Sequence, residues 1–139
     1  MGITLSDEDR RHLALFEDVT GATGVDCVQE SGRLLVVVAR GELGEAIGPQ
    51  GQHVKTFEER VDQPVRLVEN AETPAAFVAN ALSPAAVYNV TISENRDTVA
   101  YVEVASEDRG VAIGKDGRTI EAARALAARH FDVDDVQLI

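Results

Sequence analysis

Two Gly-x-x-Gly segments with matching neighbours are the most informative feature of this sequence. Residues 46–51 read Ala-Ile-Gly-Pro-Gln-Gly, and residues 112–117 read Ala-Ile-Gly-Lys-Asp-Gly. Glycine has no Cβ, so the backbone of a ligand can approach it closely. The amide N–H groups that open a following helix are donors at the positive end of its dipole. The chemistry expected of each loop is therefore contact with phosphate.

The two loops belong to a longer repeat. One Gly-x-x-Gly is weak evidence, because glycine pairs mark ordinary turns in many proteins. Here an offset of 66 residues also brings Gly44 onto Gly110, Val54 onto Ile120 and residues 35–39 onto residues 101–105. This agreement indicates that the chain of 139 residues is a duplicated module.

Helix and strand signals place each loop between two helices. Ser6, ahead of three acidic residues, is predicted to be an N-cap, and Gly21 is predicted to end the same helix. In the first half we predict a helix over 7–20, strands over 25–29 and 33–39, a short helix over 42–47, a helix after residue 51 and a strand over 65–68. The apolar run 34–38 predicts a strand that is covered on both faces.

The second half repeats this order after a hinge at residues 69–72. Thr73 followed by Pro74 is typical of a helix start, and Pro84 stops that helix. The remaining elements are strands over 87–93 and 98–105, helices over 107–113 and 118–131, and a last strand over 133–139. The predicted fold class is α+β, with two domains, residues 1–72 and 73–139, each a three-stranded sheet packed against helices.

At first sight, the net negative charge of the chain argues against a nucleic-acid ligand. The formal net charge is −11, whereas affinity for phosphate backbones comes mainly from Lys and Arg. Only Lys55 and Lys115 are lysines, and acidic residues occur throughout. This composition is similar to that of proteins from salt-loving archaea. At about molar salt the Debye length is about 3 Å, so local contacts would decide whether a nucleic acid binds.

Several other classes of site are not indicated. Cys27 is the single cysteine, so an intramolecular disulfide is excluded, and no Cys and His residues have the spacing of zinc ligands. We therefore expect no metal, cofactor or catalytic residue. No signal peptide or membrane span is visible, which predicts a cytoplasmic protein without a membrane partner.

The order of elements, with Ile-Gly-x-x-Gly between two helices, resembles the type II KH domain over essentially the whole chain, in two tandem copies. Among KH proteins, the chain resembles the archaeal NusA-like transcription factors. The resemblance implies an RNA-binding protein that clamps about four nucleotides of single-stranded RNA at each loop. It also implies a role in transcription elongation or termination, on nascent RNA near RNA polymerase. We expect a monomer.

The second loop is the better electrostatic site. Lys115 lies within it, and Arg118 occupies a first turn where a bound anion would offset the unfavourable helix dipole. Asp116 offers another interpretation, because it could neutralise Lys115 or cap the helix. The first loop has no cation, so Gln52, His53 and Lys55 would supply its polar contacts. The two isoleucines beside the loops are candidates for groove or core, and the core is favoured. The candidate RNA-binding residues are Ile47, Gly48, Pro49, Gln50, Gly51, Gln52 and Lys55, with Ile113, Gly114, Lys115, Asp116, Gly117 and Arg118.

Weaker candidates have ordinary explanations. Arg109 and Arg124 could border the second groove, although an exposed helical Arg is more often a salt-bridge partner. His12 and His130 are expected at the surface. The acidic residues at 132, 134 and 135 could suggest a metal-dependent nuclease, but no acid, base and nucleophile converge on them. The remaining alternatives are a ribosome-assembly factor that binds ribosomal RNA and a KH-fold protein-interaction module.

Overall fold

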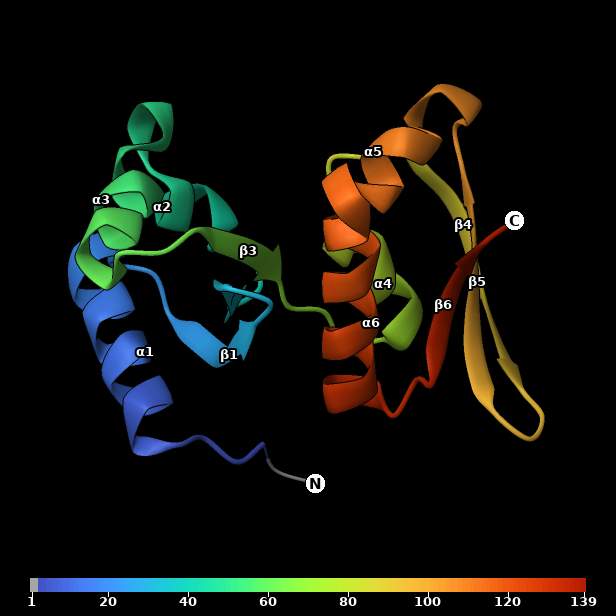
Figure 1. Cartoon of the computed structure of the whole chain (residues 1–139), viewed down its shortest axis with the longest axis horizontal. Coiled ribbons are helices and arrows are strands. Elements are labelled where there is room, and N and C mark those ends of the chain that lie inside the picture. Colours follow the sequence, from blue (N-terminus) through green and yellow to red (C-terminus); the bar gives the residue numbers. More distant parts are fainter. Residues whose placement is uncertain (1–2) are drawn as a thin grey trace. The chain divides into compact units, whose positions relative to one another are not determined.

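A computed structural model describes residues 3–139, which divide between Asn70 and Ala71 into two compact units. Both units are α+β, and each contains one three-stranded sheet (Figure 1). The predicted fold class is confirmed at this level. None of the helices formed by the described residues has the length and apolar character needed to span a bilayer.

The first unit has six helices and strands with one 3₁₀ turn. In chain order these are α1 (Asp7–Thr20), β1 (Gly24–Glu30), β2 (Arg33–Val38), α2 (Leu43–Ile47), the 3₁₀ turn Pro49–Gly51, α3 (Gln52–Val61) and β3 (Val65–Glu69).

The second unit has the same order of helices and strands. These are α4 (Pro74–Ala81), β4 (Val87–Glu94), β5 (Thr98–Val104), the 3₁₀ turn Ser106–Asp108, α5 (Arg109–Ile113), the 3₁₀ turn Lys115–Gly117, α6 (Arg118–Phe131) and β6 (Asp135–Leu138). The predicted helix over 107–113 is thus divided. Its first turn tightens at Asp108, whose amide donates to Ala105 O at 2.8 Å and whose carboxylate accepts from the Ala86 amide.

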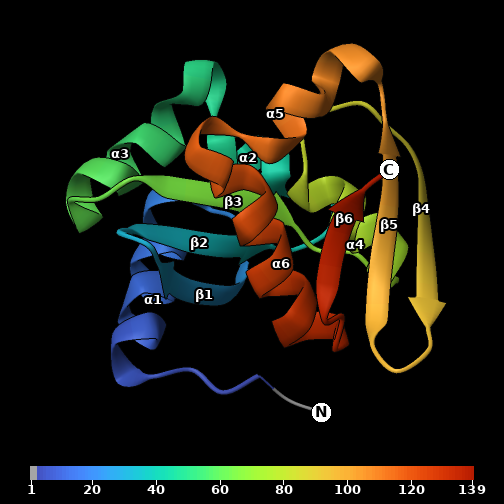
Figure 2. The same ribbon diagram turned by 45° about the vertical axis from the view of Figure 1, so that its right-hand side comes forward.

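Each sheet places its middle strand between an antiparallel and a parallel neighbour. The strand orders are β1-β2-β3 and β4-β5-β6 (Figure 2). In the first sheet Val36 lies opposite Cys27 on β1 and Leu67 on β3. In the second, Val102 lies opposite Val90 and Leu138. The parallel pairs require crossovers, and each crossover carries one glycine loop.

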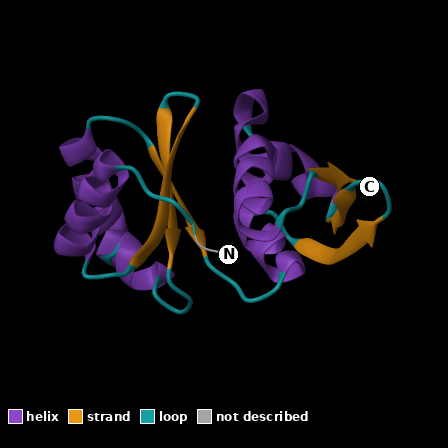
Figure 3. Ribbon diagram, turned by 90° about the horizontal axis from the view of Figure 1, so that it is seen from below, coloured by secondary structure: helices purple, strands orange, loops and turns teal. Residues whose placement is uncertain are grey.

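Within each unit the helices cover one face of the sheet (Figure 3). The core of the first unit lies between these layers, where the Phe16 and Phe57 rings meet edge to face at 5.2 Å. Strand β2 is buried along its whole length, which confirms the prediction for residues 34–38. In the second unit Phe77 and Leu126 are fully buried. A small core of this kind fixes the helix ends from which the loops project.

Helix α1 has the bounds that its sequence predicts, because both of its ends are capped. The Ser6 hydroxyl accepts from the Asp9 amide at 3.0 Å, and the Asp9 carboxylate accepts from the Ser6 amide at 3.4 Å. At the other end Gly21 adopts a left-handed conformation with φ 77°. Such caps satisfy the free donors and acceptors at helix ends.

Candidate nucleic-acid interface

The two glycine loops have nearly the same backbone. The first glycine of each has an extended ψ at positive φ: Gly48 has φ 77° and ψ 172°, and Gly114 has φ 81° and ψ 167°. The last glycine is left-handed and caps the next helix, with φ 74° and ψ 15° at Gly51 and φ 74° and ψ 12° at Gly117. The sequence repeat is therefore also a repeat of local geometry.

Three turn hydrogen bonds close each loop. In the second loop the Gly114 amide donates to Gly110 O at 2.8 Å and the Gly117 amide to Gly114 O at 3.0 Å. The Arg118 amide then donates to Lys115 O. The first loop has the same three bonds at the positions 66 residues earlier. The loop backbone is thus held by its own contacts before any ligand binds.

The loops differ in the amide groups that stay available. Among residues 3–139 the amides of Lys115 and Asp116 have no hydrogen-bond acceptor, so the second loop offers two donors. In the first loop Gln50 is equivalent to Asp116, but Pro49 stands where the other loop has Lys115 and has no N–H. The first loop therefore offers one such donor.

The two glycines of each loop are needed for different reasons. A Cβ on Gly48 would lie 2.4 Å from His53 Cγ, and one on Gly114 would lie 2.4 Å from Thr119 Oγ1 and 2.8 Å from its amide nitrogen. A Cβ on Gly51 or Gly117 would meet no described atom within 4 Å. The last glycine of each loop therefore faces open space, where a ligand backbone could approach.

The isoleucines beside the loops do not belong to the core, and the prediction that favoured the core is wrong. Ile47 is 39% exposed and Ile113 is 40% exposed, whereas the preceding Ala46 and Ala112 are fully buried. A five-residue helix packs through one narrow face, and the alanines occupy it. Each loop therefore has an exposed apolar side chain next to its amide donors.

The charged residues of the second loop are exposed. Within residues 3–139 neither Lys115 nor Asp116 forms a side-chain hydrogen bond or an ion pair. Asp116 therefore does not neutralise Lys115, and helix α6 has no side-chain cap. Arg118 is partly buried in the first turn of α6.

In the first loop the predicted polar residues are placed differently. His53 Nδ1 lies 2.7 Å from Glu45 O, so this ring is held against the preceding helix. Gln52 and Lys55 are exposed on the first turn of α3. Lys55 is therefore the cation on the first turn of the helix that this loop opens, and Arg60 lies in the last turn of the same helix.

The weaker arginine candidates are engaged within the second unit. Arg109 Nη1 donates to Ile139 O at 2.8 Å. Arg124 forms ion pairs with Glu121 at 2.6 Å and Asp135 at 3.0 Å. Arg109 thus contacts the backbone that follows β6, and Arg124 links residues of α6 and β6. The ion pairs of Arg124 agree with the prediction that it is a salt-bridge partner.

The acidic residues near the C-terminus bind neighbouring backbone. The Asp134 carboxylate accepts from the Thr98 amide at 2.7 Å. Asp135 accepts from the Val136 amide at 2.8 Å and from Gln137 at 3.0 Å. These hydrogen bonds start strand β6 at Asp135, two residues later than predicted.

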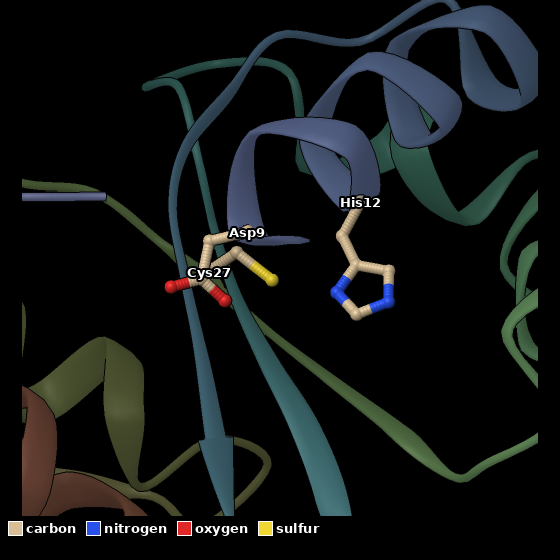
Figure 4. A group of neighbouring side chains, drawn as sticks. All are labelled: Asp9, His12 and Cys27. Carbon is tan, nitrogen blue, oxygen red and sulfur yellow. The ribbon is translucent and has the colours of Figure 1, made fainter. Parts of the chain in front are cut away.

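The structure brings together one group of side chains that sequence spacing did not suggest. Ligand atoms of Asp9, His12 and Cys27 all lie within 4.8 Å of one another (Figure 4). His12 and His130 are also partly buried, which corrects their expected surface positions. The His130 ring packs against Phe77 at 5.3 Å. A helical Asp and His three residues apart, followed by a cysteine in the next strand, is a weak signal that only the fold makes visible.

Comparison with known proteins agrees with this fold. Residues 74–138 match the family described as "NusA-like second KH domain". Among solved structures the chain is similar to the crystal structure of APE1850, with a TM-score of 0.87 and 27% identity over 97% of this chain and 100% of the other.

Curated relatives match over nearly the whole chain. A protein of Halococcus morrhuae is 61% identical and one of Halobacterium salinarum is 59% identical, and each match covers 99% of both chains. A protein of Methanocaldococcus jannaschii is 27% identical over 99% of this chain and 75% of its own. All three carry the name "Probable transcription termination protein NusA". With this identity over its full described length, the chain belongs to the archaeal NusA-like family of KH-domain transcription factors.

Proposed function

We propose that this chain contains two tandem type II KH domains, residues 1–72 and 73–139, and that both Gly-x-x-Gly loops bind single-stranded RNA. The observation that carries the proposal is the conformational identity of the loops. Each combines a close-approach glycine, at least one available amide at a helix start and an exposed isoleucine. This combination suits a sugar–phosphate backbone on one side and bases on the other.

The second loop is proposed as the main phosphate site. Its two available amides and the exposed Lys115 ammonium are three donor groups at one place. Arg118 adds a second cation on the adjoining helix turn. Contacts to phosphate fix the position of the RNA without reading its sequence, so this loop would set affinity and the exposed isoleucines would support the bases.

We also propose that the chain acts in transcription elongation or termination, as the names of its relatives suggest, on nascent RNA near RNA polymerase. It is expected to act as a cytoplasmic monomer. The alternative within the same chemistry is a factor that binds ribosomal RNA during ribosome assembly. Crosslinking the protein to RNA in its native cells separates these roles. Nascent transcripts would support the proposed role, whereas ribosomal precursors would support the alternative.

Binding itself is tested by fluorescence anisotropy with a labelled random-sequence RNA of about 12 nucleotides, enough for two loops that each hold about four. The variant Lys115→Asp should weaken binding on the order of tenfold, because reversing the charge loses a charge-assisted contact and adds repulsion. Unchanged affinity at moderate salt would remove the second loop from the site.

A matched control is available in the same unit. Arg96 is exposed in the turn between β4 and β5, at the end of β5 opposite to the glycine loop (Figure 1). Arg96→Asp makes the same change in net charge as Lys115→Asp. If both variants weakened binding equally, affinity would depend on net charge and not on the loop. If RNA did not bind the unsubstituted chain at all, a protein-interaction role of the acidic surface would be favoured.

A further inference from the structure

We propose that Asp9, His12 and Cys27 form a zinc-binding site in the first unit. Their ligand atoms, a carboxylate oxygen, a ring nitrogen and the sulfur, lie within 4.8 Å of one another (Figure 4). Such a separation allows three ligands to reach one ion after small side-chain movements. The site is separate from the Gly-x-x-Gly loop, because its residues come from α1 and β1.

The local fold explains why these three side chains meet. Asp9 and His12 are three residues apart on α1, so they lie on the same face of the helix. Cys27 is fully buried in β1, in the layer of the core that α1 covers. The N-cap at Ser6 fixes where α1 begins. Asp9 and His12 therefore lie on the side of the helix that faces β1.

A second observation points to a ligand that His12 would bind. His12 Nδ1 is buried and has no hydrogen-bond partner among the described residues. In Figure 4 the ring nitrogen bonded to Cγ points toward the Cys27 sulfur and the Asp9 carboxylate. Most buried polar atoms in folded proteins have a partner, and an exception needs an explanation. A metal ion between these three groups would supply the partner.

The donor set indicates which ion would bind. Thiolate and imidazole are ligands of zinc, whereas magnesium and calcium prefer sites made of oxygen atoms. Three protein ligands would leave a fourth tetrahedral position for water. The Asp9 carboxylate can bind the ion through its other oxygen, because its Oδ2 already accepts the hydrogen bond from the Ser6 amide.

The proton balance is simple. Zinc binding replaces the Cys27 thiol proton, which is released to solvent, and the sulfur binds as thiolate. His12 binds through Nδ1 as a neutral imidazole with its proton on Nε2. One zinc ion, one thiolate and one carboxylate then have no net charge. A neutral cluster is compatible with the buried position of the sulfur.

The test uses the full chain after treatment with a chelator. Zinc is titrated in competition with a chromogenic chelator, and cobalt is added separately as a spectroscopic probe. The proposal expects one equivalent of zinc, a thiolate-to-cobalt charge-transfer absorption, release of one proton and no response to magnesium. Absence of stoichiometric zinc binding to the folded chain overturns it.

Variants locate the ion. Asp9→Asn, His12→Gln and Cys27→Ser should each weaken zinc binding by more than about tenfold, since loss of a ligand costs at least as much as loss of an outer hydrogen bond to one. Asp7→Asn and His130→Gln are the matched controls, on the same helix turn and in the other unit. Zinc binding that is unchanged in all three variants would overturn the assignment. Asp9→Asn keeps the test decisive if Cys27→Ser does not fold, because Asp9 is only partly buried and asparagine can still accept the bond from Ser6.

Discussion

Gln50 and Asp116 have the same left-handed backbone conformation, with φ 56° and ψ 26° at Gln50 and φ 57° and ψ 26° at Asp116. One side chain is neutral and the other is acidic, so the shared conformation does not come from the residue type. Positive φ is unfavourable for both residues. The flanking glycines and the three turn hydrogen bonds therefore impose it, and the loop keeps its shape while the side chains at its tip differ.

The first prediction concerns how much each glycine of the second loop contributes to the stability of the folded chain. Gly117→Ala should destabilise the chain by about 1 kcal/mol, the usual cost of a Cβ at left-handed φ. Gly114→Ala should cost at least about 1 kcal/mol more, because its Cβ also meets the side chain and the backbone nitrogen of Thr119. Urea denaturation at constant potassium chloride measures both values. Equal losses would mean that the contact with Thr119 relaxes freely.

The second prediction is that stability rises with salt. The chain has 24 acidic and 13 basic residues, so its folded state carries strong self-repulsion in dilute buffer. Screening at about molar ionic strength limits that repulsion to about 3 Å. The melting temperature should therefore increase from dilute buffer to molar potassium chloride. A melting temperature that does not depend on salt would contradict this explanation.

The regular elements could be read from the sequence where their ends carry strong local signals. Helix α1 starts after Ser6 and ends before Gly21, and α6 runs from Arg118 to Phe131, as predicted. Both are long and amphipathic, so one buried stripe fixes them. The start of β6 was predicted two residues early, because only the tertiary bond from the Thr98 amide to Asp134 decides where the strand begins.

The side-chain environments were harder to predict. Ile47 and Ile113 follow buried alanines, and only the packing of a short helix reveals that the larger side chains face solvent. The group of Asp9, His12 and Cys27 depends on a contact between a helix and a strand. The spacing of residues along the sequence indicates which side chains are neighbours on one helix or strand. It therefore indicates the pair Asp9 and His12 on α1, but not the nearby Cys27 on β1.

The third prediction concerns acid stability. The hydrogen bond from Gln137 lowers the pKa of Asp135 most, burial opposes that shift, and the Val136 amide and Arg124 lower the pKa further. A carboxyl whose pKa is lower in the folded state stabilises it above the unfolded pKa, and this contribution is lost as pH falls through the folded pKa. Asp135→Asn should therefore be less stable than the unsubstituted chain near neutral pH, and the difference should shrink below about pH 4.

Thermal unfolding between neutral and acid pH measures this difference at fixed potassium chloride. Asp132→Asn is the control, because the Asp132 carboxylate accepts no hydrogen bond among residues 3–139 and asparagine tolerates its left-handed backbone. A stability difference for Asp135→Asn that did not change with pH would show that the carboxylate acts through packing and not through its charge.

The fourth prediction is that the two loops contribute unequally to RNA affinity. Residues 1–72 contain 14 acidic and 7 basic groups, a net charge of −7, whereas residues 73–139 contain 10 and 6, a net charge of −4. The second loop also has the additional amide donor and Lys115. Gly117→Asp should therefore reduce affinity by at least about tenfold, and Gly51→Asp should reduce it less.

The comparison is well matched, because Gly51 and Gly117 share φ 74° and neither has a neighbour within 4 Å of a new Cβ. Gly51→Ala and Gly117→Ala measure the effect of backbone strain without the charge, and circular dichroism must first show that all four variants are folded. The added carboxylate then lies where the RNA backbone is proposed to approach, so its effect reports how much phosphate contact that loop provides. A folded Gly51→Asp chain that loses as much affinity as Gly117→Asp, or more, would move the main phosphate site to the first unit.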